Sequence, residues 1–303
     1  MGDLTVSNSD DLATRADGSE PDDLRGGAVI ASEGCASCNG TGAAGSPASP
    51  SFIYALGRID ARFPNLSVEK EYAQALGRKA TTGLNDRQAF HASLALRENR
   101  YLARQLCWVL TVQGMDSYLL VLRDPAELDL MVNGIAPGPA PLMNAVIGVR
   151  GPVAPVGYCN GLSLPIVLVD QMYTFDRASF VSAVPKPPSV PAESFAPAVE
   201  ELFDRVLQLT DNAGATDEHR ALNYLAMRYP AVYSKVAEEY AANCSLDGVD
   251  SKVSRLSGAR TVIDVILQFT DRAVGVQKKY FVRVDVTEEF PFIVTKLSPY
   301  FDR

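Results

Sequence analysis

Two cysteines separated by two residues offer the clearest chemistry in this sequence. Cys35 and Cys38 are followed by Gly40 and Gly42, a Cys-x-x-Cys-x-Gly-x-Gly pattern typical of one half of a zinc knuckle. Two thiolates at this spacing can bind one ion, and the glycines let backbone amides turn toward the sulfur atoms. A structural zinc site has four protein ligands, so this half-site needs two more.

The missing ligands are expected from Cys107 and Cys159, or from the same knuckle of a second chain in a homodimer. Cys159 lies in the turn sequence Gly157–Gly161, which suits a ligand, whereas Cys107 opens an apolar strand, where cysteine usually acts as a small hydrophobic residue. The favoured zinc site therefore consists of Cys35, Cys38, Cys107 and Cys159. Five unevenly spread cysteines fit a reducing, cytoplasmic compartment better than a disulfide framework.

Four arginines are candidate contacts for a peptide carboxylate. Arg100 and Arg104 are four positions apart on an expected helix, and Arg58 and Arg62 flank the end of an expected strand. Guanidinium groups bind carboxylates through two parallel hydrogen bonds. Ion pairs of these arginines with acidic residues of the same chain are the alternative, and we favour it. The acidic residues are Glu69, Glu71, Asp285, Glu288 and Glu289, which could also pair with one another as carboxylates, although solvated surface charges are the usual explanation.

The sequence lacks the common catalytic motifs. There is no P-loop, no H-E-x-x-H and no G-x-S-x-G. The run Gly40–Gly45 matches G-x-G-x-x-G, but no expected strand precedes it and no helix follows, so we do not interpret it as a dinucleotide site. His91 and His219 lie in expected helices, where we predict neutral, hydrogen-bonded imidazoles. A non-catalytic protein is therefore favoured over an enzyme.

Charge and composition divide the chain at about residue 50. Residues 1–50 carry eight acidic residues against two arginines, which is −6 of the net charge of −8, and contain few large apolar side chains. We expect this Gly/Ala/Ser-rich segment to be disordered. Its acidity disfavours nucleic-acid binding, and no apolar run is long enough to cross a membrane.

Residues 51–303 are expected to form an α+β domain with mixed, largely antiparallel sheets packed against helices, because strands and helices alternate without regular βαβ order. A proline-rich stretch at 185–191 marks a sub-boundary. Expected helices include 67–75, with Ser67 as N-cap, and 86–102, with Asp86 as N-cap. Strands are expected at 52–59, 107–112, 118–122, 146–149, 166–169, 261–269, 278–286 and 292–297, and Cys244 is expected late in a helix.

Several sequence blocks resemble the domain of unknown function at the C-termini of the cyanobactin (patellamide) maturation proteases, the PatA/PatG family. The blocks are Tyr54–Ile59, Phe63–Glu71, Asn99–Trp108, Asp211–Leu225 and Val284–Phe292. The resemblance extends over about 51–303. The subtilisin-type block Gly-Thr-Ser-Met-Ala is absent, so the protease activity of the family does not carry over.

The resemblance implies a stand-alone accessory protein in the maturation of ribosomally synthesised, post-translationally modified peptides. It would bind or scaffold the precursor peptide, a modifying enzyme or a protease. The alternative is a metal-dependent peptide-modifying enzyme, which would need a zinc site with an open coordination position.

Overall fold

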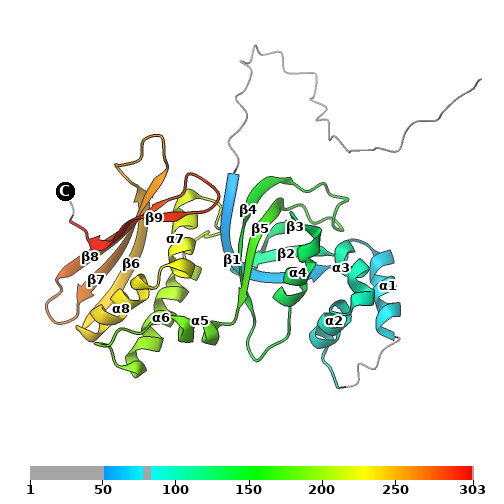
Figure 1. Ribbon diagram of the computed structural model, residues 1–303, viewed down its shortest axis with the longest axis horizontal. Coiled ribbons are helices and arrows are strands. Elements are labelled where there is room, and N and C mark those ends of the chain that lie inside the picture. Colours follow the sequence, from blue (N-terminus) through cyan, green and yellow to red (C-terminus); the bar gives the residue numbers. More distant parts are fainter. Residues whose placement is uncertain (1–50, 78–82, 302–303) are drawn as a thin grey trace, which may run out of the picture. The chain divides into compact units, whose positions relative to one another are not determined.

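The structure is a computed structural model that describes residues 51–77 and 83–301 (Figure 1). The chain divides into two compact units, Met1–Ala48 and Ser49–Arg303, and the described residues all lie in the second. The expected acidic segment 1–50, with Cys35 and Cys38, lies outside the described residues. None of the described helices is long and apolar enough to cross a membrane.

Five strands close into a barrel in the order β1-β2-β3-β5-β4. All neighbouring pairs are antiparallel except β3 and β5, which are parallel. The strands are β1 (Ser51–Arg62), β2 (Cys107–Val112), β3 (Met115–Leu122), β4 (Met143–Val153) and β5 (Pro165–Phe175). The expected α+β class with largely antiparallel sheets is confirmed, whereas closure into a barrel was not predicted.

Strand β1 is buried on both of its faces. Ile53 and Ala55 belong to the core inside the barrel, while Tyr54 and Leu56 belong to a second core on the outside of the barrel wall. A strand that is covered on both faces needs an apolar run rather than strict alternation, which explains the unbroken apolar sequence at its start.

Helices between the strands cover the barrel. They are α1 (Leu66–Gly77), α2 (Asp86–Leu94), the 3₁₀ turn η1 (Arg97–Asn99), α3 (Arg100–Gln105), the 3₁₀ turn η2 (Pro125–Glu127), α4 (Leu128–Gly134) and α5 (Arg177–Ala183). The single helix expected at 86–102 is therefore wrong. The buried Asn99 donates to the backbone carbonyl of Ser93 (2.9 Å), which fixes the break between α2 and α3.

Both predicted N-caps in this region are displaced to asparagines. Asn85, not Asp86, caps α2: its side chain accepts from the backbone N–H of Gln88 (2.8 Å), and Gln88 returns the bond (3.0 Å). For α1, the Asn65 side chain accepts from Val68 N–H (3.1 Å). An amide oxygen reaches these donors as well as a carboxylate or hydroxyl does. Residue type alone therefore could not decide which of two neighbouring residues is the N-cap.

A second sheet, in the order β6-β7-β8-β9, is entirely antiparallel. Its strands are β6 (Cys244–Val253), β7 (Val262–Asp271), β8 (Gln277–Asp285) and β9 (Phe292–Pro299), and its helices are α6 (Ala192–Leu207), α7 (Asp217–Arg228) and α8 (Ala231–Ala241). Strand β6 was not predicted. Cys244 begins this strand instead of lying in a helix, and it is fully buried.

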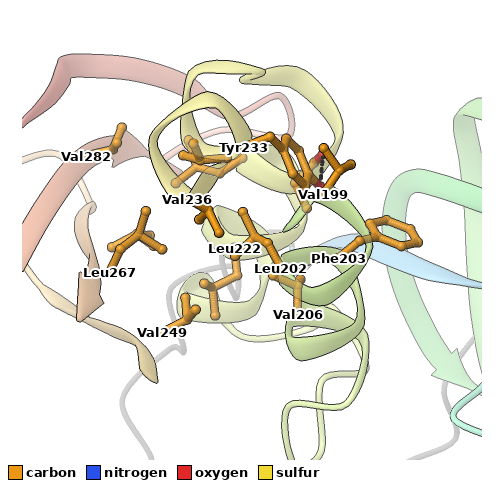
Figure 2. Close-up of a cluster of buried hydrophobic side chains, with 14 of the residues drawn as sticks. Val199, Leu202, Phe203, Val206, Leu222, Tyr233, Val236, Val249, Leu267 and Val282 are labelled. Atoms are coloured by element: carbon orange, nitrogen blue, oxygen red, sulfur yellow. Dashed lines mark hydrogen bonds between the residues drawn. The ribbon is translucent and has the colours of Figure 1, made fainter. Parts of the chain in front are cut away.

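The three helices bury their apolar faces against this sheet. Figure 2 shows Val199, Leu202 and Val206 of α6 packed with Leu222 and Val236, and facing Leu267 and Val282 of the sheet. The i, i+3, i+4, i+7 spacing of apolar residues in α6 produces this face.

Candidate functional site

A large cavity in the described part of the chain lies beside the second half of β1. It has a volume of about 1200 Å³. Its walls come from β1, from helices α1 and α2, from the β2–β3 turn and from the C-terminal end of α6. A cavity of this size can hold several residues of a peptide.

One edge of β1 is left open in this cavity. Residues 51–57 of β1 pair with β4, and residues 58–62 pair with β2. Strand β4 begins at Met143, opposite the point where β1 turns to β2, so no described strand continues along the other edge of 58–62. The cavity-lining residues Arg58, Ile59, Asp60 and Ala61 come from this segment.

Strand alternation identifies the backbone groups on the open edge. The Tyr54 N–H donates to the Gly214 carbonyl (2.9 Å), away from β4. The backbone groups of even-numbered residues in β1 therefore point away from β4, and those of odd-numbered residues point toward its side. The backbone N–H and C=O groups of Ile59 and Ala61 therefore face the side that β4 would have occupied. The Ala61 N–H is bonded only to the neighbouring Asp60 carboxylate (3.0 Å), which any incoming strand can replace.

Three aromatic rings form one wall of the cavity. Phe63 follows β1, Tyr72 lies on α1 and Phe90 lies on α2, and the ring centroids are 5.0–5.9 Å apart. Each ring is half-buried, so part of each face remains open to the cavity. Stacked and edge-on rings at these separations give a rigid apolar surface.

The β2–β3 turn forms the opposite wall. Gln113 and Gly114 both have positive φ (51° and 82°), as a two-residue hairpin turn requires. The Gln113 side chain donates to the carbonyls of Leu207 (2.8 Å) and Leu209 (2.7 Å) at the end of α6. These bonds fasten the turn to the helix and fix the width of the cavity on that side.

The charged groups of the cavity favour an acidic ligand. Asp60 is paired with Arg62 (3.4 Å), and Asp204 is paired with Arg177. Arg58 and Arg87 also line the cavity and are exposed, and neither forms an ion pair with another described residue. The guanidinium groups are therefore the charges that a ligand can neutralise.

The four arginines predicted to bind a carboxylate do not form one clamp. Only Arg58 lines the cavity. Arg62 pairs with Asp60 and with Asp116 (3.1 Å), and Arg100 pairs with Asp129, so both form ion pairs, but with other acidic residues than the expected ones. Arg104 is exposed on α3 and does not line the cavity. Arg87 was missed, since nothing in the sequence brings α2 next to β1.

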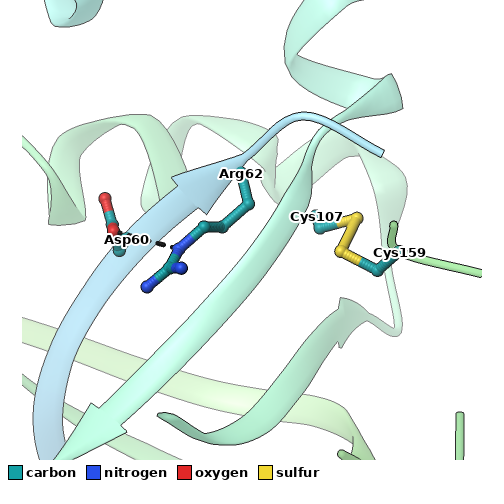
Figure 3. The surroundings of a disulfide bond; sticks show 4 residues. All are labelled: Asp60, Arg62, Cys107 and Cys159. Atoms are coloured by element: carbon teal, nitrogen blue, oxygen red, sulfur yellow. Dashed lines mark ion pairs between the residues drawn. A yellow bond between two sulfur atoms is a disulfide. The ribbon is translucent and has the colours of Figure 1, made fainter. Parts of the chain in front are cut away.

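The two predicted zinc ligands in the described residues come together as a disulfide. Cys107, at the start of β2, and Cys159, in the loop after β4, are bonded with a Cα–Cα distance of 6.1 Å (Figure 3). This pairing differs from the expectation of reduced cysteines. The fold buries both side chains in one small apolar cluster with Val109, Leu119 and Ala154, where the two sulfur atoms meet. A disulfide sulfur has no thiolate to bind a metal.

The other metal ligands of the expected site, Cys35 and Cys38, lie outside the described residues. Within residues 51–77 and 83–301, no three His, Cys, Asp or Glu side chains are placed to hold a metal ion. The four-cysteine site would therefore require reduced Cys107 and Cys159.

The two histidines do not share a site. Burial lowers the pKa of both His91 and His219, so both imidazoles are neutral at pH 7. The His219 backbone N–H donates to the Thr216 hydroxyl (3.2 Å) at the start of α7.

A carboxyl pair joins β5 to the loop after β8. The carboxyl groups of Asp170 and Glu289 lie next to each other, and Arg123 forms a two-bond ion pair with Asp170. Arg123 lowers the pKa of Asp170, whereas burial and the neighbouring Asp170 raise the pKa of Glu289 to about 7. The sequence pointed to Glu289 as a pairing candidate but not to Asp170, which lies in the middle of a strand.

Comparison with known proteins supports one family. The family model described as PatG C-terminal matches residues 189–300, from α6 to β9. The chain therefore contains a PatG C-terminal-like domain. A solved structure of a "PatG Domain of Unknown Function" is 21% identical and covers 82% of this chain and 98% of that chain, with a TM-score of 0.67. This chain and that solved structure share a fold, and the similarity extends beyond residues 189–300. No curated protein matches the chain.

Proposed function

We propose that this chain is a non-catalytic binding subunit in the maturation of ribosomally synthesised, post-translationally modified peptides, and that the cavity beside β1 binds an extended precursor segment. The PatG likeness supports the biosynthetic context. The open edge of β1 inside the cavity is the observation that carries the binding role.

The binding mode is strand addition. An extended peptide that pairs with Ile59 and Ala61 satisfies the backbone groups on the open edge of β1, and main-chain hydrogen bonds of this kind tolerate variation in sequence. Successive side chains of the peptide point to opposite sides. One set faces the aromatic wall of Phe63, Tyr72 and Phe90, and an acidic side chain or a terminal carboxylate reaches Arg58 or Arg87.

Calorimetry with synthetic segments of the precursor peptides encoded beside the gene tests the proposal. We expect saturable binding of at least one extended segment. N-methylation of alternate peptide amides removes the donors of strand pairing, and we expect one of the two N-methylation patterns to abolish binding while the other leaves it nearly unchanged.

The arginine contacts are tested with matched variants. Arg58→Ala and Arg87→Ala each remove one charge-assisted hydrogen-bond donor, which is worth about 1.5–3 kcal/mol and corresponds to roughly 10- to 100-fold weaker binding of an acidic segment. Arg104→Ala is the control, because this arginine is exposed and lies outside the cavity. Equal binding by all three variants, or saturable turnover of a peptide by the isolated protein, would contradict the proposal.

A further inference from the structure

A second, smaller cavity lies outside the barrel wall and is separate from the groove beside β1. Its volume is about 390 Å³. It is bounded by Tyr54 of β1, by Tyr173 and Phe175 of β5, by α5 and by the C-terminal end of α7. No residue of the proposed peptide groove lines it.

We propose that this cavity binds a small aromatic carboxylic acid, with the ring between the aromatic side chains and the carboxylate held by Tyr54 and Arg228. The volume is at the lower end of the range of small-molecule sites. A ligand with one ring and a short acid chain suits it better than a peptide does.

The apolar part of the cavity is built from aromatic rings that support one another. Phe175 and Phe180 have their centroids 5.4 Å apart, and Phe180 packs in turn on the buried Phe203 (4.8 Å). Met227 adds a polarisable, adaptable side chain to the wall. Such a wall holds a planar ring with little loss of side-chain freedom.

The polar end of the cavity has an unused donor. Tyr54 is 1% exposed, and its hydroxyl forms no hydrogen bond of good geometry with a described residue, although the Arg228 guanidinium lies close enough to lower its pKa. A buried hydroxyl without a hydrogen-bond partner is unfavourable, so a ligand that accepts a hydrogen bond from it recovers that cost. Burial raises the pKa of Tyr54 to about 12, which keeps the hydroxyl protonated as a donor across the physiological range.

The positive charge at this end is also available. The Arg228 guanidinium stacks over the ring of Tyr173 (4.3 Å to the centroid) and lies next to the Tyr54 hydroxyl. Stacking fixes the plane of the guanidinium and leaves its N–H donors at the edge. Arg228 is exposed and forms no ion pair with another described residue. A carboxylate can therefore accept from both Arg228 and Tyr54.

The experiment compares 3-phenylpropionate with its neutral analogue 3-phenylpropan-1-ol by calorimetry and by thermal shift on the full chain. We expect saturable binding of the acid in the high micromolar to low millimolar range, and at least about tenfold weaker binding of the alcohol. Equal affinity for the acid and the alcohol, or no saturable binding of either, would overturn the proposal.

Three variants place the ligand in this cavity. Arg228→Gln should weaken binding of the acid by about tenfold or more, and Tyr54→Phe should weaken it several-fold. Arg272→Gln is the matched control, because Arg272 also lies over an aromatic ring, that of Tyr240 (5.9 Å), but not in the cavity. Ala183→Trp fills the cavity from an exposed position on α5 and should abolish binding.

The experiments can refute the peptide groove and the aromatic-acid cavity independently of each other. Ala183→Trp should retain binding of the precursor segment, because Ala183 does not line the groove beside β1. If 3-phenylpropionate binds Ala183→Trp as tightly as it binds the unmodified protein, the assigned cavity is wrong, whatever the result for peptides.

Discussion

The side chain of Asn223 on α7 donates a hydrogen bond to the backbone carbonyl of Tyr54 on β1 (2.7 Å), and both residues are buried. This bond joins the PatG C-terminal-like part of the chain to the barrel. Asn223 also exchanges two hydrogen bonds with the buried Asn212 (2.8 and 3.1 Å). Every polar atom of the Asn223 side chain is therefore used away from water.

We predict that Asn223→Ala destabilises the protein by about 2–4 kcal/mol. The variant leaves the Tyr54 carbonyl and the Asn212 Oδ1 without a donor in a dry environment, although Asn212 Nδ2 still donates to the Val206 carbonyl (3.0 Å). Each group that loses its partner costs about 1–3 kcal/mol. Chemical denaturation at pH 7 measures the change in the free energy of unfolding. Asn133→Ala, at an exposed position on α4, is the control and should change stability by less than about 0.5 kcal/mol. Equal stability of the two variants would contradict the role of the network.

We predict that the disulfide between Cys107 and Cys159 contributes about 2–4 kcal/mol to stability. It closes a loop with a sequence separation of 52 residues, and loops of this length restrict the unfolded chain substantially. Denaturation with and without a reductant should show the difference. The double variant Cys107→Ser/Cys159→Ser should resemble the reduced protein and should not respond to the reductant. A reductant effect that persists in the double variant would assign it to other cysteines.

We predict that zinc binding by the expected four-cysteine site depends on the oxidation state. Oxidised protein should bind no zinc through Cys107 and Cys159, because neither is a thiolate. In reduced protein, native mass spectrometry should find about one zinc per chain, and Cys159→Ser should lose it. One zinc per two chains that survives Cys159→Ser would favour the dimeric alternative, and stability unchanged by a chelator in reduced protein would end the zinc hypothesis.

We predict that Glu289→Gln changes how stability depends on pH. The pKa of Glu289 is about 7 in the folded chain, whereas its ordinary value, expected in the unfolded chain, is 4.5. Between these two pH values the folded state therefore binds more protons than the unfolded state. Stability from this group is complete below about pH 4.5 and is lost as the pH rises to about 7. Glutamine is neutral throughout, so the variant should gain stability relative to the unmodified protein as the pH rises from 5 to 8.

Denaturation midpoints at pH 5, 6, 7 and 8 measure this effect. The groups that face Glu289 are Asp170, Arg123 and Arg220, and all three stay in place in the variant. Asp170 has a lowered pKa, so its contribution is lost only as the pH falls toward the acidic range, in both proteins alike. Glu288→Gln, at the exposed neighbouring position, is the control. Parallel curves for all three proteins would show that burial and Asp170 do not raise the pKa of Glu289.

Local patterns in the sequence determined most of the elements. The apolar run at 52–59, the hairpin at 107–122 and the amphipathic helix α6 could be predicted, because each depends on periodicity and on turn residues within a few positions. Strand β6 could not, since Gly248 and several charged residues interrupt its alternation and only pairing with β7 makes it a strand. The helix expected at 86–102 failed for a similar reason: the contact of Asn99 with Ser93 ends the helical pattern.

The candidate sites were decided by tertiary structure. The sequence named Arg58, but only the switch of β1 from β4 to β2 places this arginine beside an open strand edge, and only packing brings Arg87 of α2 to the same cavity. The sequence also named Cys107 and Cys159. Only the fold brings these two cysteines, 52 residues apart in sequence, into one small buried cluster, where they form a disulfide. Residue types and spacing fix what chemistry a side chain can perform, whereas its partners lie far away in sequence and are fixed only when the chain folds.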